Sequence, residues 1–236
     1  MTAPNIKASL RTAGRVLLGQ SDSGELAALD RRQLPLGLLA TWLVGIGRHW
    51  DNPRLQWFQH LGLGSLAYVF VLAALLWVVV APFRPPRWTY ENVLTFVTLT
   101  SPPAVFYAIP VERFLPLETA TLVNVWFLAM VALWRVTLLL RFLTRRAKLA
   151  TGEGAVVALL PLTLIVTALT MLNLDEVVFD VMSGNSATHD PNVGAYTVLV
   201  VLTTLATFAF LPLLIAYVLF VVRARRVWQQ KREEPY

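Results

Sequence analysis

The stretch LGLGSLAYVFVLAALLWVVVA, residues Leu61–Ala81, is apolar almost throughout and contains no charged residue. A bilayer core about 30 Å thick requires roughly 20 apolar residues in helical form, so this stretch predicts a transmembrane helix. Another apolar run, Leu34–Gly47, is shorter and rich in glycine, and its length alone fits a re-entrant or interfacial segment better than a span. The remaining runs of bilayer length are Asn92–Val111, Thr119–Leu140, Ala155–Leu174 and Ala195–Val222.

The composition agrees with a membrane protein. Of the 236 residues, 56% are hydrophobic and only 14% are charged, against roughly 25% charged in ordinary soluble domains. This excludes a water-soluble globule, a disordered chain and a coiled coil. The chain has no cysteine, which excludes disulfides, thiolate metal sites, iron–sulfur clusters and cysteine nucleophiles. The fold class expected is an all-α integral membrane helical bundle.

Charge is distributed unevenly among the connections between the apolar runs. The N-terminal lead, the loops after Ala81 and Leu140, and the tail after Val222 hold sixteen of the 20 cations and have a net charge of +9. The other connections sum to −4. The positive-inside rule therefore places both termini in the cytoplasm, which requires an even number of crossings. We expect six transmembrane helices with Leu34–Gly47 as the first, in a bacterial plasma (inner) membrane.

Three parts of the chain follow from this layout: a cytoplasmic amphipathic lead (1–32), a transmembrane domain (33–222) and a basic cytoplasmic tail (223–236). Residues 5–18 of the lead have helical periodicity, with apolar residues on one face. Beside that face Lys7, Arg11 and Arg15 recur at intervals of four. Such a helix is expected to bind the headgroups of an anionic leaflet. The alternative is that these cations serve only as a topology signal.

Arg135 is the one charged residue deep inside an apolar run, where an arginine costs at least about 2.5 kcal/mol at the centre of a bilayer. It lies six residues before Arg141, so its side chain could reach the cytoplasmic interface by snorkelling. The other interpretation is a buried cation that lines a substrate or proton path. The first interpretation is favoured, because snorkelling removes much of the free-energy cost of an arginine within the bilayer.

Prolines interrupt three of the expected spans. Thr98–Pro103 contains Pro102 and Pro103, and the later spans contain Pro161 and Pro212. A proline removes a backbone donor and frees a carbonyl, and broken helices in transporters use such groups to hold ions. Because no acidic residue lies deep in any span, packing kinks are favoured over an ion site. The candidate intramembrane polar site consists of Arg135, Pro102, Pro103 and Pro161.

The non-cytoplasmic connections are dense in polar groups and form a candidate interaction surface, although ordinary loop packing would explain them equally well. The three histidines there have no HExxH or HxH spacing, so no metal site is expected. No nucleophile elbow, P-loop or dinucleotide fingerprint occurs either, so we expect no catalytic residue and no cofactor. The residues of this candidate surface are Arg48, His49, Asp51, Glu112, Arg113, Asp175, Glu176 and Asp180.

The segment Leu29-Asp-Arg-Arg32 runs into the glycine-rich stretch Gly37–Gly47, and a string of hydrophobic helices then leads to a basic end. In this layout the chain resembles bacterial members of the Yip1-like membrane-protein family, although its expected number of crossings departs from that family's. The resemblance covers the lead and the hydrophobic layout, and it transfers no functional residue. It implies a non-enzymatic role in membrane organisation or partner binding.

We therefore expect an accessory or scaffold protein that acts by binding membrane lipids and other membrane proteins or copies of itself. The alternative is a small-solute or ion transporter or channel that uses the kinked helices and Arg135. The cations flank membrane spans, so the basic pI of about 10.1 is not taken to indicate a nucleic-acid partner.

Overall fold

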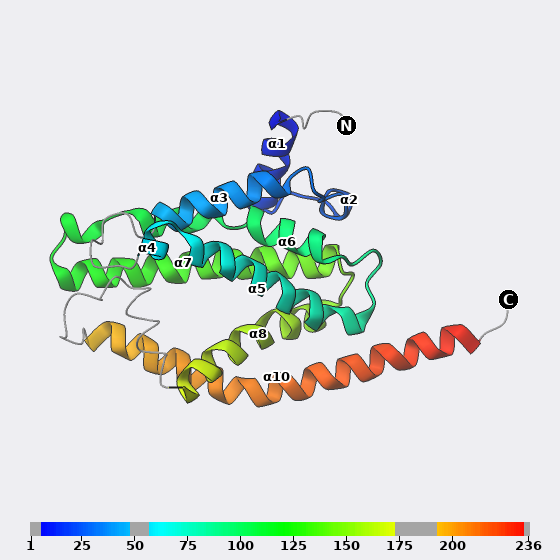
Figure 1. The fold of residues 1–236 in the computed structure, drawn as a ribbon. Coiled ribbons are helices and arrows are strands. Elements are labelled where there is room, and N and C mark those ends of the chain that lie inside the picture. Colours follow the sequence, from blue (N-terminus) through cyan, green and yellow to red (C-terminus); the bar gives the residue numbers. More distant parts are fainter. Residues whose placement is uncertain (1–5, 48–56, 173–192, 234–236) are drawn as a thin grey trace.

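The computed structural model describes residues 6–47, 57–172 and 193–233, and every regular element in these ranges is a helix (Figure 1). The all-helical fold expected from the sequence is therefore confirmed for this part of the chain. The α-helices are α1 (Ile6–Leu17), α2 (Ser23–Ala27), α3 (Leu34–Gly47), α4 (Trp57–His60), α5 (Leu63–Val80), α6 (Tyr90–Leu99), α7 (Leu117–Arg145), α8 (Thr151–Met171) and α10 (Val193–Glu233). The 3₁₀-helices are η1 (Ala81–Phe83), η2 (Pro102–Ala108) and η3 (Val111–Arg113).

Four helical stretches in the described residues are long and apolar enough to cross a membrane: Leu63–Phe83, Thr119–Arg145, Thr151–Met171 and Val200–Gln230. Each covers most of one of the apolar runs of bilayer length, which supports an integral membrane protein. Helix α3 is apolar but has only 14 residues, about 21 Å. The count of six spans and the N-in/C-in orientation stay predictions.

The run Asn92–Val111 does not form one helix. Helix α6 starts after Thr89, whose Oγ1 accepts a hydrogen bond from the Asn92 N–H at 3.3 Å, and it ends at Leu99. The chain then turns into η2 at Pro102, because two successive prolines cannot donate the backbone hydrogen bonds that an α-helix requires. The interruption expected at Thr98–Pro103 is thus confirmed, but the result is two short helices instead of a kinked span.

Helix α6 lies at the centre of the bundle, with every residue from Asn92 to Leu99 buried. It packs mainly against α3 and α5. The contact with α3 is close because Gly37 has no side chain: a Cβ there would lie 2.3 Å from Thr98 Oγ1. At the end of α6 the Thr41 hydroxyl lies within hydrogen-bonding distance of the Gly37 carbonyl and of Ser101 Oγ, at 2.9 Å from each. Small and hydroxylated residues therefore join α3 to the broken segment.

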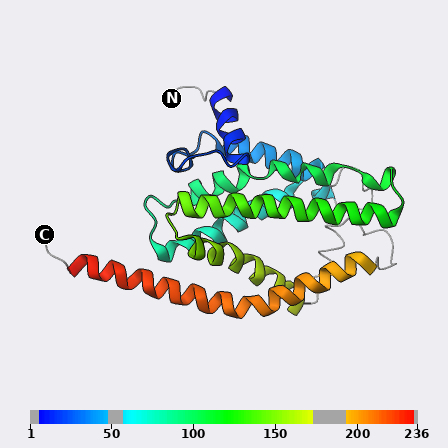
Figure 2. The ribbon, with the colours of Figure 1, turned by 180° about the vertical axis from the view of Figure 1, so that it is seen from behind.

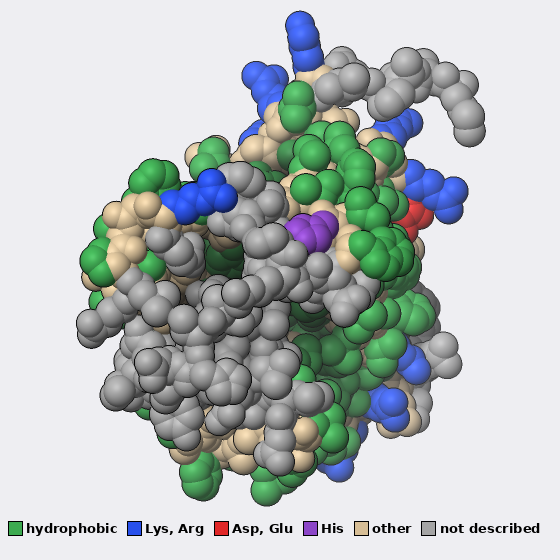
Figure 3. Space-filling model, turned by 60° about the vertical axis from the view of Figure 1, so that its left-hand side comes forward, with side chains coloured by type: hydrophobic (Ala, Val, Ile, Leu, Met, Phe, Trp, Pro, Cys, Tyr) green, Lys and Arg blue, Asp and Glu red, His purple; other side chains and the backbone are tan. Residues whose placement is uncertain are grey.

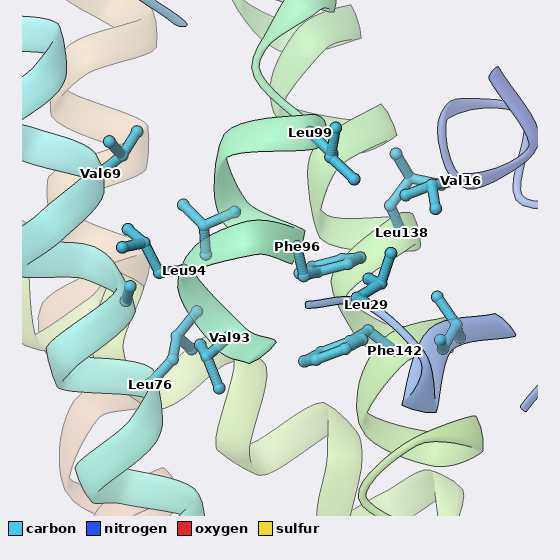
Figure 4. Packing of buried hydrophobic residues seen from close by; sticks show 13 residues of the cluster. Val16, Leu29, Val69, Leu76, Val93, Leu94, Phe96, Leu99, Leu138 and Phe142 are labelled. Carbon is cyan, nitrogen blue, oxygen red and sulfur yellow. The ribbon is translucent and has the colours of Figure 1, made fainter. Parts of the chain in front are cut away.

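The hydrophobic core around α6 includes residues of the N-terminal lead (Figure 4). The rings of Phe96 on α6 and Phe142 on α7 stack with centroids 4.0 Å apart. Val16, Leu26 and Leu29 belong to the same cluster and are each at most 4% exposed. Part of the lead is therefore packed into the same core as α6 and α7, and its binding to a membrane surface stays a prediction.

Helices α8 and α10 pack along each other on the other side of the bundle, and α10 extends past the remaining helices (Figures 1 and 2). Two residues on the inner face of α10, Thr203 and Ala206, are at most 9% exposed. Further along this face the Tyr217 hydroxyl donates a 2.9 Å hydrogen bond to the Val79 carbonyl of α5. This bond fastens α10 to the end of α5. Pro161 and Pro212 lie inside α8 and α10, which continue through them.

Candidate functional site at the basic end

One end of the bundle, which we call the basic end, brings together the loop after η1, the last turn of α7, the start of α8 and the basic part of α10. These elements come from the connections that the charge pattern places in the cytoplasm. The cations at this end are Arg84, Arg87, Arg145, Arg146, Lys148, Arg223, Arg225 and Arg226. Two arrangements among them are specific: one buried arginine and one open pocket.

Arg146, the residue after α7, is the buried cation, and it is only 5% exposed. Its Nε donates to Asn92 Oδ1 at 3.1 Å and its Nη1 to the Pro86 carbonyl at 2.6 Å, while Nη2 donates to the Arg87 carbonyl. Its hydrogen-bond partners are all neutral, and no salt bridge to Arg146 occurs among the described residues. The guanidinium thus holds the loop between α5 and α6 against the end of α7.

The surroundings of Arg146 disfavour its charge. Burial lowers the pKa of its guanidinium below the ordinary value, and the positive charge of Arg87 lowers that pKa further. An arginine nevertheless stays protonated in proteins, so Arg146 remains a donor only. A buried charge is tolerated when its donors are satisfied, and here each of the three guanidinium nitrogens has an acceptor.

Asn92 extends this linkage to the lead. Its side chain is 4% exposed, and its Nδ2 donates to the carbonyls of Leu26 at 3.1 Å and Leu29 at 2.9 Å. A second lead contact is the ion pair between Arg31 Nε and Glu91 Oε1 at 3.0 Å. The lead, α6 and the end of α7 are therefore connected through one amide and one guanidinium.

The pocket at the basic end has a volume of about 420 Å³ and is lined by Arg84, Arg225, Trp228 and Gln229. Arg84 follows η1 with a φ of 51° and its N–H donates to the Ala81 carbonyl, while the other three residues lie on α10. The Arg84 Cζ lies 5.7 Å from the centroid of the Trp228 ring, within the range of a cation–π interaction. The pocket therefore combines two cations with an aromatic face and an amide.

The three cations expected to bind a membrane surface lie on α1 as predicted, but they differ in their surroundings. Lys7 and Arg11 are exposed. Arg15 forms an ion pair with Glu25 of α2, with Nη1 and Oε1 2.7 Å apart. Leu10, on the apolar face of α1, is 54% exposed. The exposed part of α1 thus offers two cations and one large apolar side chain, whereas Arg15 is engaged within the lead.

Arg135 is half-buried on α7, with its Cζ 6.0 Å from the centroid of the Tyr68 ring on α5. Its neighbour Trp134 donates a 2.9 Å hydrogen bond from Nε1 to the Leu17 carbonyl at the end of α1. Arg135 therefore lies at the level along α7 where α1 meets the bundle.

The other members of the candidate polar site are spread over separate elements. Pro102 and Pro103 begin η2, next to the Thr41 and Ser101 hydroxyls. Pro161 is buried in α8, which packs mainly against α10 and α7. No hydrogen bond in the described residues joins these prolines to Arg135.

Most of the candidate exterior surface, namely Arg48, His49, Asp51, Asp175, Glu176 and Asp180, lies outside the described residues. Glu112 and Arg113 both belong to η3, and Arg113 is exposed. In the ranges that the structure describes, no group of three or more metal-ligating side chains is found. Figure 3 shows hydrophobic side chains along one flank of the molecule. This surface stays a prediction.

The sequence did not indicate Arg146 or Asn92 as a linked pair, because loop cations are usually solvated and hydropathy carries no information on tertiary contacts. An available signal was Asn92 itself, a polar residue in the first turn of an apolar helix. No protein-family model, curated protein or solved structure matches this chain. The functional argument therefore rests on the chain's own geometry.

Proposed function

We propose that this protein is a non-enzymatic accessory or scaffold component of a membrane assembly, and that it binds a transmembrane helix of a partner or of a second copy through α10. The observation that carries this proposal is the outer face of α10. Only its inner face packs on α8 and the end of α5, while large apolar side chains on the rest of the helix are exposed. They include Val201, Leu205, Phe208, Leu211, Ile215 and Leu219.

The length of α10 supports a role beyond membrane anchoring. Its 41 residues span about 60 Å, twice the roughly 30 Å of a bilayer core. The part after Val222, which we call the overhang, carries exposed cations together with Val227 and Trp228, which are 45% and 43% exposed. Lipid tails cover apolar side chains within the bilayer core but not on an overhang. A partner that follows α10 out of the membrane would cover both parts.

Tight packing around the lead also favours a scaffold. The space left between the lead, α6 and α7 is only about 10 Å³, enough for no more than a single water molecule. Arg135 lies beside the junction of α1 with the bundle. If α1 lies at the membrane surface, Arg135 is at the interface, where its charge costs little and requires no ion pathway.

Photocrosslinking in native membranes tests the proposal. A photoreactive residue at Phe208, which is 77% exposed on α10, is expected to form discrete protein adducts. Trp126 on α7, which is 67% exposed, is the matched control and is expected to contact lipid. The purified protein in liposomes should show no solute flux. Equal adducts at both positions, or flux without adducts, would contradict the proposal.

A transporter or channel is the second candidate, favoured by the broken segment α6–η2 and its buried hydroxyls. Thr41, Thr98 and Ser101 are each at most 5% exposed and lie where the helix ends. Their hydrogen bonds are satisfied within α3 and α6, by Gly37, Thr95 and Val97 carbonyls. A transport mechanism would have to open these bonds. A measured flux that Arg135→Leu leaves unchanged would eliminate the form of this mechanism that depends on Arg135.

A further inference from the structure

We propose that the pocket between Arg84 and the overhang of α10 binds a phosphate group, as carried by an anionic phospholipid or by a soluble phosphate ester. This inference goes beyond the proposed scaffold function. The pocket shares Trp228 with the overhang, but its test measures bound phospholipid, so its failure can be told apart from a failure of the crosslinking test. The pocket is separate from the lead, whose exposed cations lie on α1.

The inner face of α10 explains where the pocket forms. This face packs on α8 and on the end of α5 and continues at regular helical intervals through Tyr217 and Ala224 to Trp228. Trp228 lies beyond the part of α10 that packs on α5 and η1, and its ring faces Arg84. The pocket therefore lies where α10 extends past the ends of α5 and η1.

The packing of the preceding residue, Phe83, fixes the position of Arg84. Phe83 is 8% exposed, and its ring lies 5.9 Å from the ring of Tyr217 in an edge-on arrangement. Together with the hydrogen bond from Tyr217 to the Val79 carbonyl, this contact fixes the end of α5 against α10. Arg84 then leaves η1 with left-handed backbone dihedrals. Its guanidinium is held on the same side as Arg225.

The charge of the pocket points to an anion. Two guanidinium groups line it, and none of the described residues that line it is a carboxylate. The salt bridges among the described residues involve Arg15, Arg31 and Arg32, so Arg84 and Arg225 have no acidic partner there. Guanidinium groups bind phosphate oxygens through paired N–H donors, and Gln229 adds an amide donor. The volume of about 420 Å³ lies in the range of small-molecule sites.

The position in the chain fits a phospholipid headgroup. The pocket begins at Arg84, directly after the apolar stretch that ends at Phe83, and Arg225 follows Val222 closely on α10. Tryptophan is enriched at the membrane–water interface, and basic pockets between transmembrane helices bind anionic headgroups. A soluble phosphate ester offers the same oxygens, so the experiment must separate the two sources.

The test uses the full chain in nanodiscs of phosphatidylcholine, with and without phosphatidylglycerol, and native mass spectrometry to measure bound phosphatidylglycerol. Arg84→Gln and Arg225→Gln are each expected to weaken retention about tenfold or more, because each removes a charge-assisted hydrogen bond to the phosphate. Arg226→Gln is the matched control, because Arg226 is exposed on the same helix but does not line the pocket. It should weaken retention by at most about fivefold, the general attraction of one cation to an anionic surface, and by less than either pocket variant.

Competition by soluble glycerol phosphate identifies the source. Displacement of bound phosphatidylglycerol by glycerol phosphate at low concentration would assign the pocket to a soluble ester, whereas no displacement would assign it to the lipid; both outcomes support a phosphate site. Equal losses for all three variants would show only general surface attraction and would overturn the proposal. Equal retention of phosphatidylcholine would overturn it as well. Thermal unfolding of each variant in detergent verifies that it is folded.

Discussion

Replacing Arg146 by methionine should destabilise the protein by about 2 kcal/mol, because it leaves the buried Asn92 Oδ1 without its donor. An unsatisfied buried acceptor costs about 1–3 kcal/mol. The carbonyls of Pro86 and Arg87 also lose a donor, but both residues are exposed, so water can replace it. Removal of a desolvated charge offsets part of the loss. The net effect therefore stays near the cost of the orphaned amide oxygen.

The measurement is equilibrium unfolding in mixed micelles, with SDS titrated into a mild detergent and helicity followed by circular dichroism. Arg145→Met is the matched control. Arg145 is exposed, and its one described hydrogen bond is from Nη1 to the Ser21 carbonyl at 2.6 Å, so the loss should stay below about 1 kcal/mol. In thermal unfolding, 2 kcal/mol corresponds to a decrease in Tm of about 4–8 °C for a chain of this size.

A double-mutant cycle isolates the link between the two side chains. Asn92→Ala and Arg146→Met together should cost about 1–2 kcal/mol less than the sum of the single variants, since either one already breaks the shared hydrogen bond. Both single variants should also expose the lead to trypsin after Arg32. Additive free energies, or equal stability of Arg146→Met and Arg145→Met, would refute the proposed linkage.

Other predictions concern helix packing, Arg135 and topology. Gly37→Ala should destabilise by about 1–3 kcal/mol because its Cβ would overlap α6, whereas Gly64→Ala, with open space around it, should be neutral or slightly stabilising; SDS unfolding compares them. Arg135→Leu should change Tm by less than about 4 °C, since a single cation–π contact is worth roughly 1 kcal/mol. In the cysteine-free chain, a single cysteine at Arg113 should react with an impermeant maleimide on intact cells. One at Lys148, beyond the other end of α7, should not react, and the reverse pattern would contradict the expected orientation.

The helices themselves could largely be predicted from the sequence, because an apolar run of bilayer length has few alternatives to helix. The end of α6 was also visible, since Pro102 and Pro103 cannot continue an α-helix. The burial of the lead was not visible, because Val16, Leu26 and Leu29 are separated by polar residues and become a core only when α6 and α7 supply the opposite surface. Hydropathy measures local composition, whereas burial depends on which distant segments meet.

The same limit applies to the candidate sites. Arg135 was conspicuous because hydropathy singles out a charge within an apolar run. In the part of the chain that the structure describes, its one specific contact is with the ring of Tyr68. Arg146 stood among several loop cations and was indistinguishable from them by sequence, although among the described residues it is the cation that is buried. The pocket at Arg84 depends on α10 passing the end of α5, a geometric relation between residues about 140 positions apart that no local pattern encodes.

The burial of α6 on every side has a consequence for how the protein is assembled. Ribosomes deliver α6 before α7, yet Phe142 of α7 supplies the ring that stacks on Phe96, and Arg146 satisfies Asn92. Until α7 emerges, α6 is a ten-residue segment with an asparagine and two threonines that is too short to span a bilayer alone. Helix α6 can therefore reach its final buried position only after α7 has been synthesised. At least this segment of the chain does not take its place in the order in which it is synthesised.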